Sequence, residues 1–201
     1  NSSFGIGVII YTLKKSFTRL NTTSIRIIGG INKSYRIVFK ASPNLRPTSD
    51  RAKETLFSWL QFEIQNKACL DLFSGTGGLG FEALSRGASH VTFVEKDKSL
   101  FKNILKNIAH LDYKTKSETA CSAALKWMQT NKRKFDIIFL DPPFDQVNYE
   151  SLLSAIKSQD LLSSEGKIYL ETDKRTEIMF SKNQVVLKDK TIGDVRLMIL
   201  Q

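Results

Sequence analysis

From residue 68 onward, short apolar runs alternate with stretches whose apolar residues recur at helical spacing. The apolar runs predict β-strands and the longer periodic stretches predict helices. The predicted strands are residues 68–73, 90–95, 115–120, 135–140 and 167–171, and the predicted helices are 78–86, 98–111, 123–129 and 151–158. Strand and helix in alternation predict a parallel sheet with helices on both of its faces.

The N-terminal part of the chain has a different pattern. Residues 25–28 and 35–39 are apolar runs on either side of a turn-rich link, which predicts a small β-hairpin. After two prolines, Thr48 or Ser49 can cap a helix whose first turn contains Asp50. The apolar residues of this helix fall on one face: Ala52, Leu56, Trp59 and Leu60.

The C-terminal part ends in a predicted antiparallel hairpin. Residues 184–188 and 195–200 flank a Gly193-Asp194 turn. We therefore expect an α/β fold of the Rossmann-like type. Its seven-stranded, mostly parallel sheet would end in the C-terminal hairpin, and the N-terminal hairpin would be a small extension.

Charge is distributed unevenly along this sequence of 201 residues. The formal net charge is +10, and residues 1–49 account for +8 of it because they contain no Asp or Glu. A basic N-terminal segment followed by a nearly neutral remainder is typical of a protein that binds a polyanion such as nucleic acid. The two cysteines have no metal-ligand spacing, so the sequence predicts no metal site.

A glycine turn follows the first strand of the alternating region. Gly75, Gly77 and Gly80 form the G-x-G-x-x-G pattern, and Glu95 lies 20 residues after Gly75. Such a turn with a distant acid is typical of a site for a nucleoside-bearing cofactor, in which the acid binds the ribose hydroxyls. By itself this pattern favours an NAD-dependent oxidoreductase.

A second candidate site follows the strand at 135–140. Asp141-Pro142-Pro143-Phe144 combines an acid and an aromatic ring on a stiff turn, because two consecutive prolines continue neither a strand nor a helix. The Asp141 carboxylate and the Pro142 carbonyl can accept hydrogen bonds from an exocyclic amine, and Phe144 can stack on a flat base. A helix-capping Asp in an ordinary proline-rich loop is the alternative interpretation.

Five sequence blocks together resemble a known family. They are RIIGG (26–30), LRPTSDRAKETLFSWL (45–60), DLFSGTGGLGFEALSRGA (71–88), VEKD (94–97) and LDPPF (140–144). In this order they resemble the RsmD-type 16S rRNA guanine-N2 methyltransferases, which are class I enzymes dependent on S-adenosylmethionine. The similarity spans roughly residues 24–201. It implies methyl transfer to an exocyclic guanine amine in small-subunit ribosomal RNA.

The resemblance also implies roles for individual residues. Asp71 would face the methionine ammonium group, and Glu95 would bind the ribose hydroxyls. The implied cofactor-binding set is Asp71, Phe73, Gly75, Gly77, Gly80, Glu95, Lys96, Ser122 and Ala123, and the implied catalytic set is Asp141, Pro142, Pro143 and Phe144. The family commonly has Asn where this chain has Ser122, which weakens the assignment of that residue to the adenine.

We expect RNA contacts from the basic N-terminal segment and the start of the helix that follows it. The implied RNA-binding residues are Arg26, Lys33, Arg36, Arg46, Thr48 and Arg51. Capping and ion pairing at a helix start would explain the last three equally well. The chain departs from the family pattern at residues 33–36, where a Gly and an Arg are missing, and at Lys53, where Arg is commoner.

The resemblance divides the chain into three segments. Residues 1–23 are an N-terminal extension of unknown role, 24–47 form the basic hairpin and its loop, and 48–201 form the methyltransferase domain. We expect a cytoplasmic monomer whose partner is ribosomal RNA within a small-subunit particle, with no membrane association. Residues 14–24 are basic and rich in Ser and Thr, so organellar targeting stays open as an alternative.

Three other functional classes stay open at this point. An NAD-dependent oxidoreductase would explain the glycines and Glu95 but not residues 45–60 or 140–144. A DNA amino-methyltransferase would share Asp141-Pro142-Pro143-Phe144 but not the block at 45–60. A non-catalytic RNA-binding protein is disfavoured, because every element of the candidate site is present.

Overall fold

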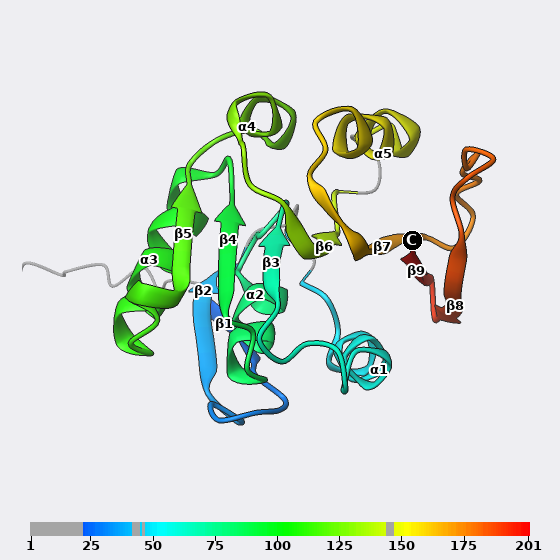
Figure 1. The fold of residues 1–201 in the computed structure, drawn as a ribbon. Coiled ribbons are helices and arrows are strands. Elements are labelled where there is room, and N and C mark those ends of the chain that lie inside the picture. The colour runs from blue at the N-terminus through cyan, green and yellow to red at the C-terminus, as the bar shows by residue number, and fades with distance from the viewer. Residues whose placement is uncertain (1–21, 42–44, 46, 144–146) are drawn as a thin grey trace, which may run out of the picture.

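The alternating pattern folds into one seven-stranded sheet with helices on both faces (Figure 1). The computed structural model describes residues 22–41, 45, 47–143 and 147–201. The strands of the sheet are β3 (Ala68–Asp71), β4 (His90–Val94), β5 (Ser117–Ala120), β6 (Phe135–Leu140), β7 (Leu162–Asp173), β8 (Val186–Ile192) and β9 (Val195–Leu200). Their spatial order is β5-β4-β3-β6-β7-β9-β8. The first five strands in this order are parallel, and β9 pairs antiparallel with both β7 and β8, as the sequence predicted.

The helices form two layers that bury opposite faces of the sheet. Their bounds are α1 (Asp50–Trp59), α2 (Gly78–Ser85), α3 (Lys98–His110), α4 (Ala124–Thr130) and α5 (Tyr149–Ser158). Side chains from α1, α2 and α3 form one apolar cluster with one face of the sheet, and side chains from α4 and α5 form a second cluster with the other. Alternation along each strand produces this division, because successive side chains point to opposite faces.

The predicted N-terminal hairpin forms a separate two-stranded sheet. It consists of β1 (Thr22–Arg26) and β2 (Arg36–Lys40), paired antiparallel. Ile37 and Phe39 of β2 are buried, whereas Arg36, Val38 and Lys40 are exposed, so one face of the hairpin packs on the domain. In Figure 1 the hairpin lies next to α2, and its connecting loop lies at the amino ends of the parallel strands.

The predicted element boundaries need small corrections. The third strand begins at Ser117 instead of 115, because Lys114–Lys116 form a short 3-10 helix. Strand β7 runs over twelve residues, much longer than the predicted 167–171, and its pairing with β6 shifts register between Phe135 and Ile137. Gly166 and the polar residues 163–165 hid this extension, because they do not form an apolar run.

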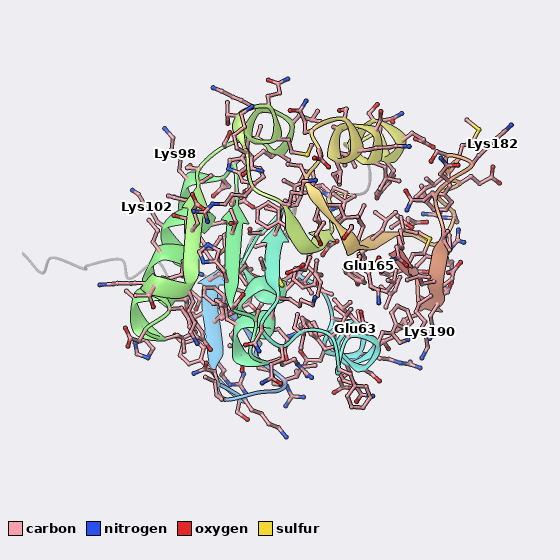
Figure 2. All side chains as sticks on the ribbon, in the orientation of Figure 1. Glu63, Lys98, Lys102, Glu165, Lys182 and Lys190 are labelled. Atoms are coloured by element: carbon pink, nitrogen blue, oxygen red, sulfur yellow. The ribbon has the colours of Figure 1, made fainter. Side chains whose placement is uncertain are left out.

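Exposed lysines lie at both edges of the molecule. Figure 2 shows Lys98 and Lys102 on α3 at one side, and Lys182 and Lys190 at the other, near and on β8. Among the residues that the structure describes, no helix is long and apolar enough to cross a membrane.

Candidate cofactor and substrate site

A cleft opens at the carboxyl ends of the parallel strands, where ligands bind in sheets of this type. Its volume is about 1740 Å³. The cleft is lined by residues that follow β3, β4 and β6, and also by β1, β2, the start of α1 and the turn between β8 and β9. The two sites predicted from separate parts of the sequence, 71–80 and 141–143, therefore open into one space.

Asp71 lies at the end of β3 beneath the glycine turn. Its side chain is 3% exposed, and its Oδ2 accepts a hydrogen bond from the Gly80 amide at 3.0 Å. Burial raises the pKa of the Asp71 carboxyl to about 7, the Gly80 hydrogen bond opposes this shift, and the charges of Asp141 and Glu95 add to it. A cationic group placed beside Asp71 would favour its ionised form.

Glu95 follows β4 and holds the glycine turn in place. Its Oε2 accepts a hydrogen bond from the Gly75 amide at 2.7 Å, and its Oε1 accepts one from the Asp97 amide at 2.7 Å. Burial raises its pKa, and these backbone donors oppose the shift. A carboxylate oxygen accepts more than one hydrogen bond, so Glu95 can bind hydroxyl groups while it keeps these contacts.

The three glycines of the turn have different structural roles. Gly75 lines the cleft, whereas Gly77 and Gly80 are not among its lining residues. Gly77 is the N-cap of α2, with a left-handed backbone. A Cβ atom at Gly80 would lie 2.2 Å from the Phe93 ring, so Gly80 allows α2 to pack closely against β4.

The remaining predicted cofactor residues also border the cleft. Phe73, Lys96, Ser122 and Ala123 line it together with Asp71, Gly75 and Glu95. The Ser122 amide donates a hydrogen bond to the Glu95 carbonyl at 3.1 Å, which fixes the loop after β5 against the end of β4. Among the described residues, no group of three or more potential metal ligands occurs.

Asp141 lies at the cleft, one residue beyond the end of β6. The Thr48 hydroxyl donates a hydrogen bond to Asp141 Oδ2 at 2.8 Å. Pro142 and Pro143 line the same cleft, and the predicted stacking residue Phe144 lies outside the described residues. The hydrogen bond from Thr48 joins two blocks that are 93 positions apart in the sequence.

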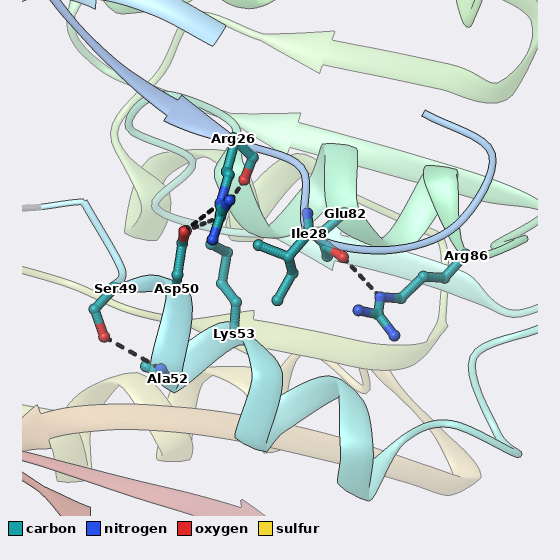
Figure 3. A network of polar contacts seen from close by, with 8 residues as sticks. All are labelled: Arg26, Ile28, Ser49, Asp50, Ala52, Lys53, Glu82 and Arg86. Carbon is teal, nitrogen blue, oxygen red and sulfur yellow. Dashed lines mark hydrogen bonds and ion pairs between the residues drawn. The ribbon is translucent and has the colours of Figure 1, made fainter. Parts of the chain in front are cut away.

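The helix α1 is joined to the hairpin by a polar network around the buried Lys53 (Figure 3). Lys53 is 1% exposed, and its Nζ donates a hydrogen bond to the Arg26 carbonyl and lies 3.1 Å from Asp50 Oδ1. Arg26 Nε donates to Asp50 Oδ2 at 2.7 Å, and Ser49 caps the helix by accepting from the Ala52 amide. Sequence analysis missed the buried Lys53, because Lys is almost never buried without a partner and nothing local revealed the partner.

The other predicted RNA-binding residues lie in different places. Arg36 is exposed on β2, and Arg26 and Arg36 border a smaller hollow beside the cleft. Lys33 and Arg51 are exposed and border neither hollow, and Arg46 lies outside the described residues. Thr48 contacts Asp141 and so belongs to the cleft itself.

One buried acidic residue of the cleft was absent from the sequence predictions. Glu171 on β7 is 4% exposed and lines the cleft, and its Oε2 accepts a hydrogen bond from the Tyr169 hydroxyl at 2.7 Å. The sequence contained one signal for this residue, because Glu171 interrupts an otherwise apolar strand. The signal indicates a site residue only once β7 is known to lie beside β6.

Comparison with known proteins identifies the family of this chain. The family model described as conserved hypothetical protein 95 matches residues 25–201. Ribosomal RNA small subunit methyltransferase D of Haemophilus influenzae is 38% identical over 192 residues, covering 94% of this chain and all of that protein. The enzyme of the same name from Escherichia coli is 34% identical, covering 88% of this chain and 89% of that protein.

A solved structure shares the fold. An Escherichia coli protein described as a candidate methyltransferase superposes with a TM-score of 0.80 at 32% identity. The match covers 89% of this chain and 98% of the other.

Proposed function

Since the chain belongs to the family described as conserved hypothetical protein 95, we propose that it methylates small-subunit ribosomal RNA, with S-adenosylmethionine as methyl donor and the N2 amine of a guanine as acceptor. One observation carries this proposal. Asp141 and the two prolines after it line the same cleft as Asp71 and Glu95. An acceptor site for an amine therefore lies beside a site suited to a nucleoside with a cationic amino-acid tail.

The donor half of the proposal rests on complementary charge and hydrogen bonding. Asp71 would pair with the methionine ammonium group, and Glu95 would accept from the ribose hydroxyls. Ser122 and Ala123 would lie against the adenine. Bound in this way, S-adenosylmethionine supplies an electrophilic methyl group on a sulfonium.

The acceptor half concerns a poor nucleophile. The lone pair of guanine N2 is delocalised into the ring, and hydrogen bonds to Asp141 and to the Pro142 carbonyl would favour a more pyramidal nitrogen. The N2 lone pair then forms a bond to the methyl carbon, the carbon–sulfur bond breaks with its electron pair going to sulfur, and N2 loses a proton that Asp141 can accept. Alignment of the two groups contributes roughly 7–11 kcal/mol in comparable cases.

Thr48 orients the catalytic Asp141 in this scheme. Its hydroxyl donates to Asp141 Oδ2, and Ser49, its neighbour in the chain, caps α1. The orientation of Asp141 therefore depends on α1, which is joined to the basic hairpin through Asp50 and Lys53. Arg26, Lys33, Arg36, Arg46 and Arg51 stay predicted RNA contacts.

The proposal is tested by methylation of small-subunit particles, and of naked ribosomal RNA, followed by mass mapping of the modified nucleotide. Calorimetric titration should show binding of S-adenosylmethionine and none of NADH. Binding of NADH alone, or methylation of DNA in preference to RNA, would contradict the proposal.

The role of Asp141 is tested by substitution. We expect Asp141→Ala to lower methyl transfer by about 10²-fold or more, with cofactor affinity within a few-fold of that of the unsubstituted protein, because in this scheme the carboxylate binds the acceptor amine and not the cofactor. Asp189→Ala, on the outer strand β8, is the matched control and should retain activity. Full activity of Asp141→Ala would show that the loop after β6 has another role.

A further inference from the structure

Four acidic residues lie at the carboxyl ends of four neighbouring strands. In the spatial order β4-β3-β6-β7 they are Glu95, Asp71, Asp141 and Glu171, and all four line the cleft. The proposed function uses the first three. Glu171 has no role in it.

The sheet register brings Glu171 next to Asp141. Leu140 of β6 pairs with Leu170 of β7 in the parallel ladder, so the next residue on each strand is the acid. The two side chains stand on the same face as Phe139 and Tyr169, whose rings pack in the core with a centroid separation of 6.4 Å. Two carboxyl groups therefore stand together above two buried aromatic rings.

The hydroxyl of Tyr169 lies close to both carboxyl groups. Its side chain is fully buried, and burial raises the pKa of its hydroxyl well above the usual value, with the charges of Glu171 and Asp141 adding to the shift. The hydroxyl donates to Glu171 Oε2 and so fixes the orientation of that carboxyl group.

One structural role of Glu171 is to accept this hydrogen bond. That role does not require a carboxyl group, because a Gln side chain accepts from a hydroxyl equally well. Burying a carboxylate also costs free energy that an amide does not. Glu171 also lines the cleft beside Asp141, so its carboxyl group can accept hydrogen bonds from a ligand bound there.

We propose that Glu171 accepts the N1–H of the target guanine while Asp141 accepts from its N2 amine, which makes Glu171 a specificity-determining residue. The inference rests on the proposed function. Guanine presents N1–H and N2–H as adjacent donors, which two neighbouring carboxyl groups can accept together. Adenine presents a lone pair at N1, which a carboxylate would repel, so Glu171 would also exclude the wrong purine.

The test uses 2-aminopurine, which keeps the N2 amine but has a lone pair at N1. Small-subunit particles are reconstituted with RNA that carries either guanosine or 2-aminopurine at the position methylated by the unsubstituted enzyme. We expect this enzyme to prefer guanosine by about 10²-fold or more in kcat/KM, because the analogue presents a lone pair at N1 where the Glu171 carboxylate requires a donor.

Glu171→Gln should reduce this preference. The Gln oxygen can still accept from Tyr169, and its amide hydrogens then face N1. We expect kcat/KM for guanosine to fall about 10- to 100-fold, as for loss of a charge-assisted hydrogen bond, while that for 2-aminopurine is unchanged or rises. Loss of the guanine O6 in the analogue affects both enzymes alike and cancels in the ratio.

The control is Glu165→Gln, an exposed position on the same strand (Figure 2), which should keep the preference and the activity of the unsubstituted enzyme. An unchanged preference in Glu171→Gln would overturn the role of Glu171 and leave the proposed function standing. If the unsubstituted enzyme fails to methylate guanosine in the particle, the proposed function itself fails.

A second variant keeps the test decisive if Glu171→Gln does not fold. Tyr169→Phe retains the carboxyl group but removes the hydroxyl that orients it. We expect the preference for guanosine to fall about 3- to 10-fold, with affinity for S-adenosylmethionine unchanged. An unchanged preference would contradict the proposal.

Discussion

Asp71 shows how strongly the position of one side chain changes its chemistry. An exposed aspartate is ionised at neutral pH, but burial raises the pKa of Asp71 to about 7. In the unfolded chain the pKa is near the ordinary value, so between about pH 4 and pH 7 the folded state binds more protons than the unfolded state. This group therefore favours folding at low pH, and its contribution is lost as the pH rises through 7.

The first prediction at this scale concerns Asp71→Asn. The amide removes a buried carboxylate but keeps an acceptor for the Gly80 amide. At pH 8 the free energy of unfolding of the variant should therefore exceed that of the unsubstituted protein by up to about 4 kcal/mol. At pH 5 the difference should be smaller, about 1.5 kcal/mol, because the Asp71 carboxyl is then protonated in the folded state while it is largely ionised in the unfolded chain. Urea unfolding at the two pH values measures it, and the variant should no longer bind S-adenosylmethionine.

Asp189→Asn is the control with the opposite sign. Arg196 hydrogen-bonds to Asp189 and lowers its pKa, so this carboxylate favours folding above its ordinary pKa. The Asn variant should be slightly less stable than the unsubstituted protein at pH 8. Equal stability of Asp71→Asn and the unsubstituted protein at pH 8 would contradict the burial argument.

At the scale of elements, the link after β1 is fixed to the end of α2. The Glu82 carboxylate, 0% exposed, accepts from the Ile28 amide at 2.7 Å and from Arg86 Nε at 2.7 Å (Figure 3). The Ser85 hydroxyl donates to the Gly29 carbonyl at 2.6 Å, and the Ile31 amide donates to the Ser85 carbonyl at 2.8 Å. The block RIIGG therefore attaches the hairpin to the helix that follows the glycine turn.

Gly30 and Gly193 provide a matched test of this attachment. Both have a left-handed backbone, with φ of 74° and 63°. A Cβ atom at Gly30 would lie 1.9 Å from the Ser85 carbonyl oxygen, whereas one at Gly193 meets nothing within 4 Å. We expect Gly193→Ala to cost about 1–2 kcal/mol from backbone strain alone, and Gly30→Ala to cost at least about 2 kcal/mol more, measured by urea unfolding. Equal losses would mean that the hairpin moves freely away from α2.

At the scale of the whole molecule, charge is the feature that suits an RNA substrate. Strand β2 exposes Arg36 and Lys40 beside the cleft, and Lys96, Lys102 and Lys106 line its other side. Among the described residues none of these five forms an ion pair, so their charges are available to phosphate groups. The carboxylates, in contrast, lie inside the cleft.

Salt dependence of RNA binding tests this arrangement. If Arg36 contacts a phosphate, Arg36→Gln should weaken binding and reduce the slope of log affinity against log salt by about 1. Lys190→Gln, on β8 at the far edge of the sheet, should leave the slope unchanged (Figure 2). A lower slope in the Lys190 variant alone would place the RNA on the opposite side of the molecule.

Most of the fold could be predicted because its signals are local. Patterns of neighbouring residues predicted the order of strands and helices, the C-terminal hairpin and the capping of α1 near Ser49. The structure confirms all three. The sequence analysis missed the first half of β7, because this part has no apolar pattern of its own. Residues such as Leu162 are held in the strand by pairing with β6. Ends of elements depend on such partners more than their centres do.

The sequence by itself determined which chemical groups this protein has and the strand ends at which they lie. Glu95 and Asp141 were identified because they end or follow apolar runs, and the resemblance to a known family added Asp71. Only the tertiary structure decided which groups meet: Thr48 with Asp141, Tyr169 with Glu171, and Lys53 with Arg26. These contacts depend on strand register and helix docking across distant segments, and the pKa of Asp71 depends on the burial that the same packing creates.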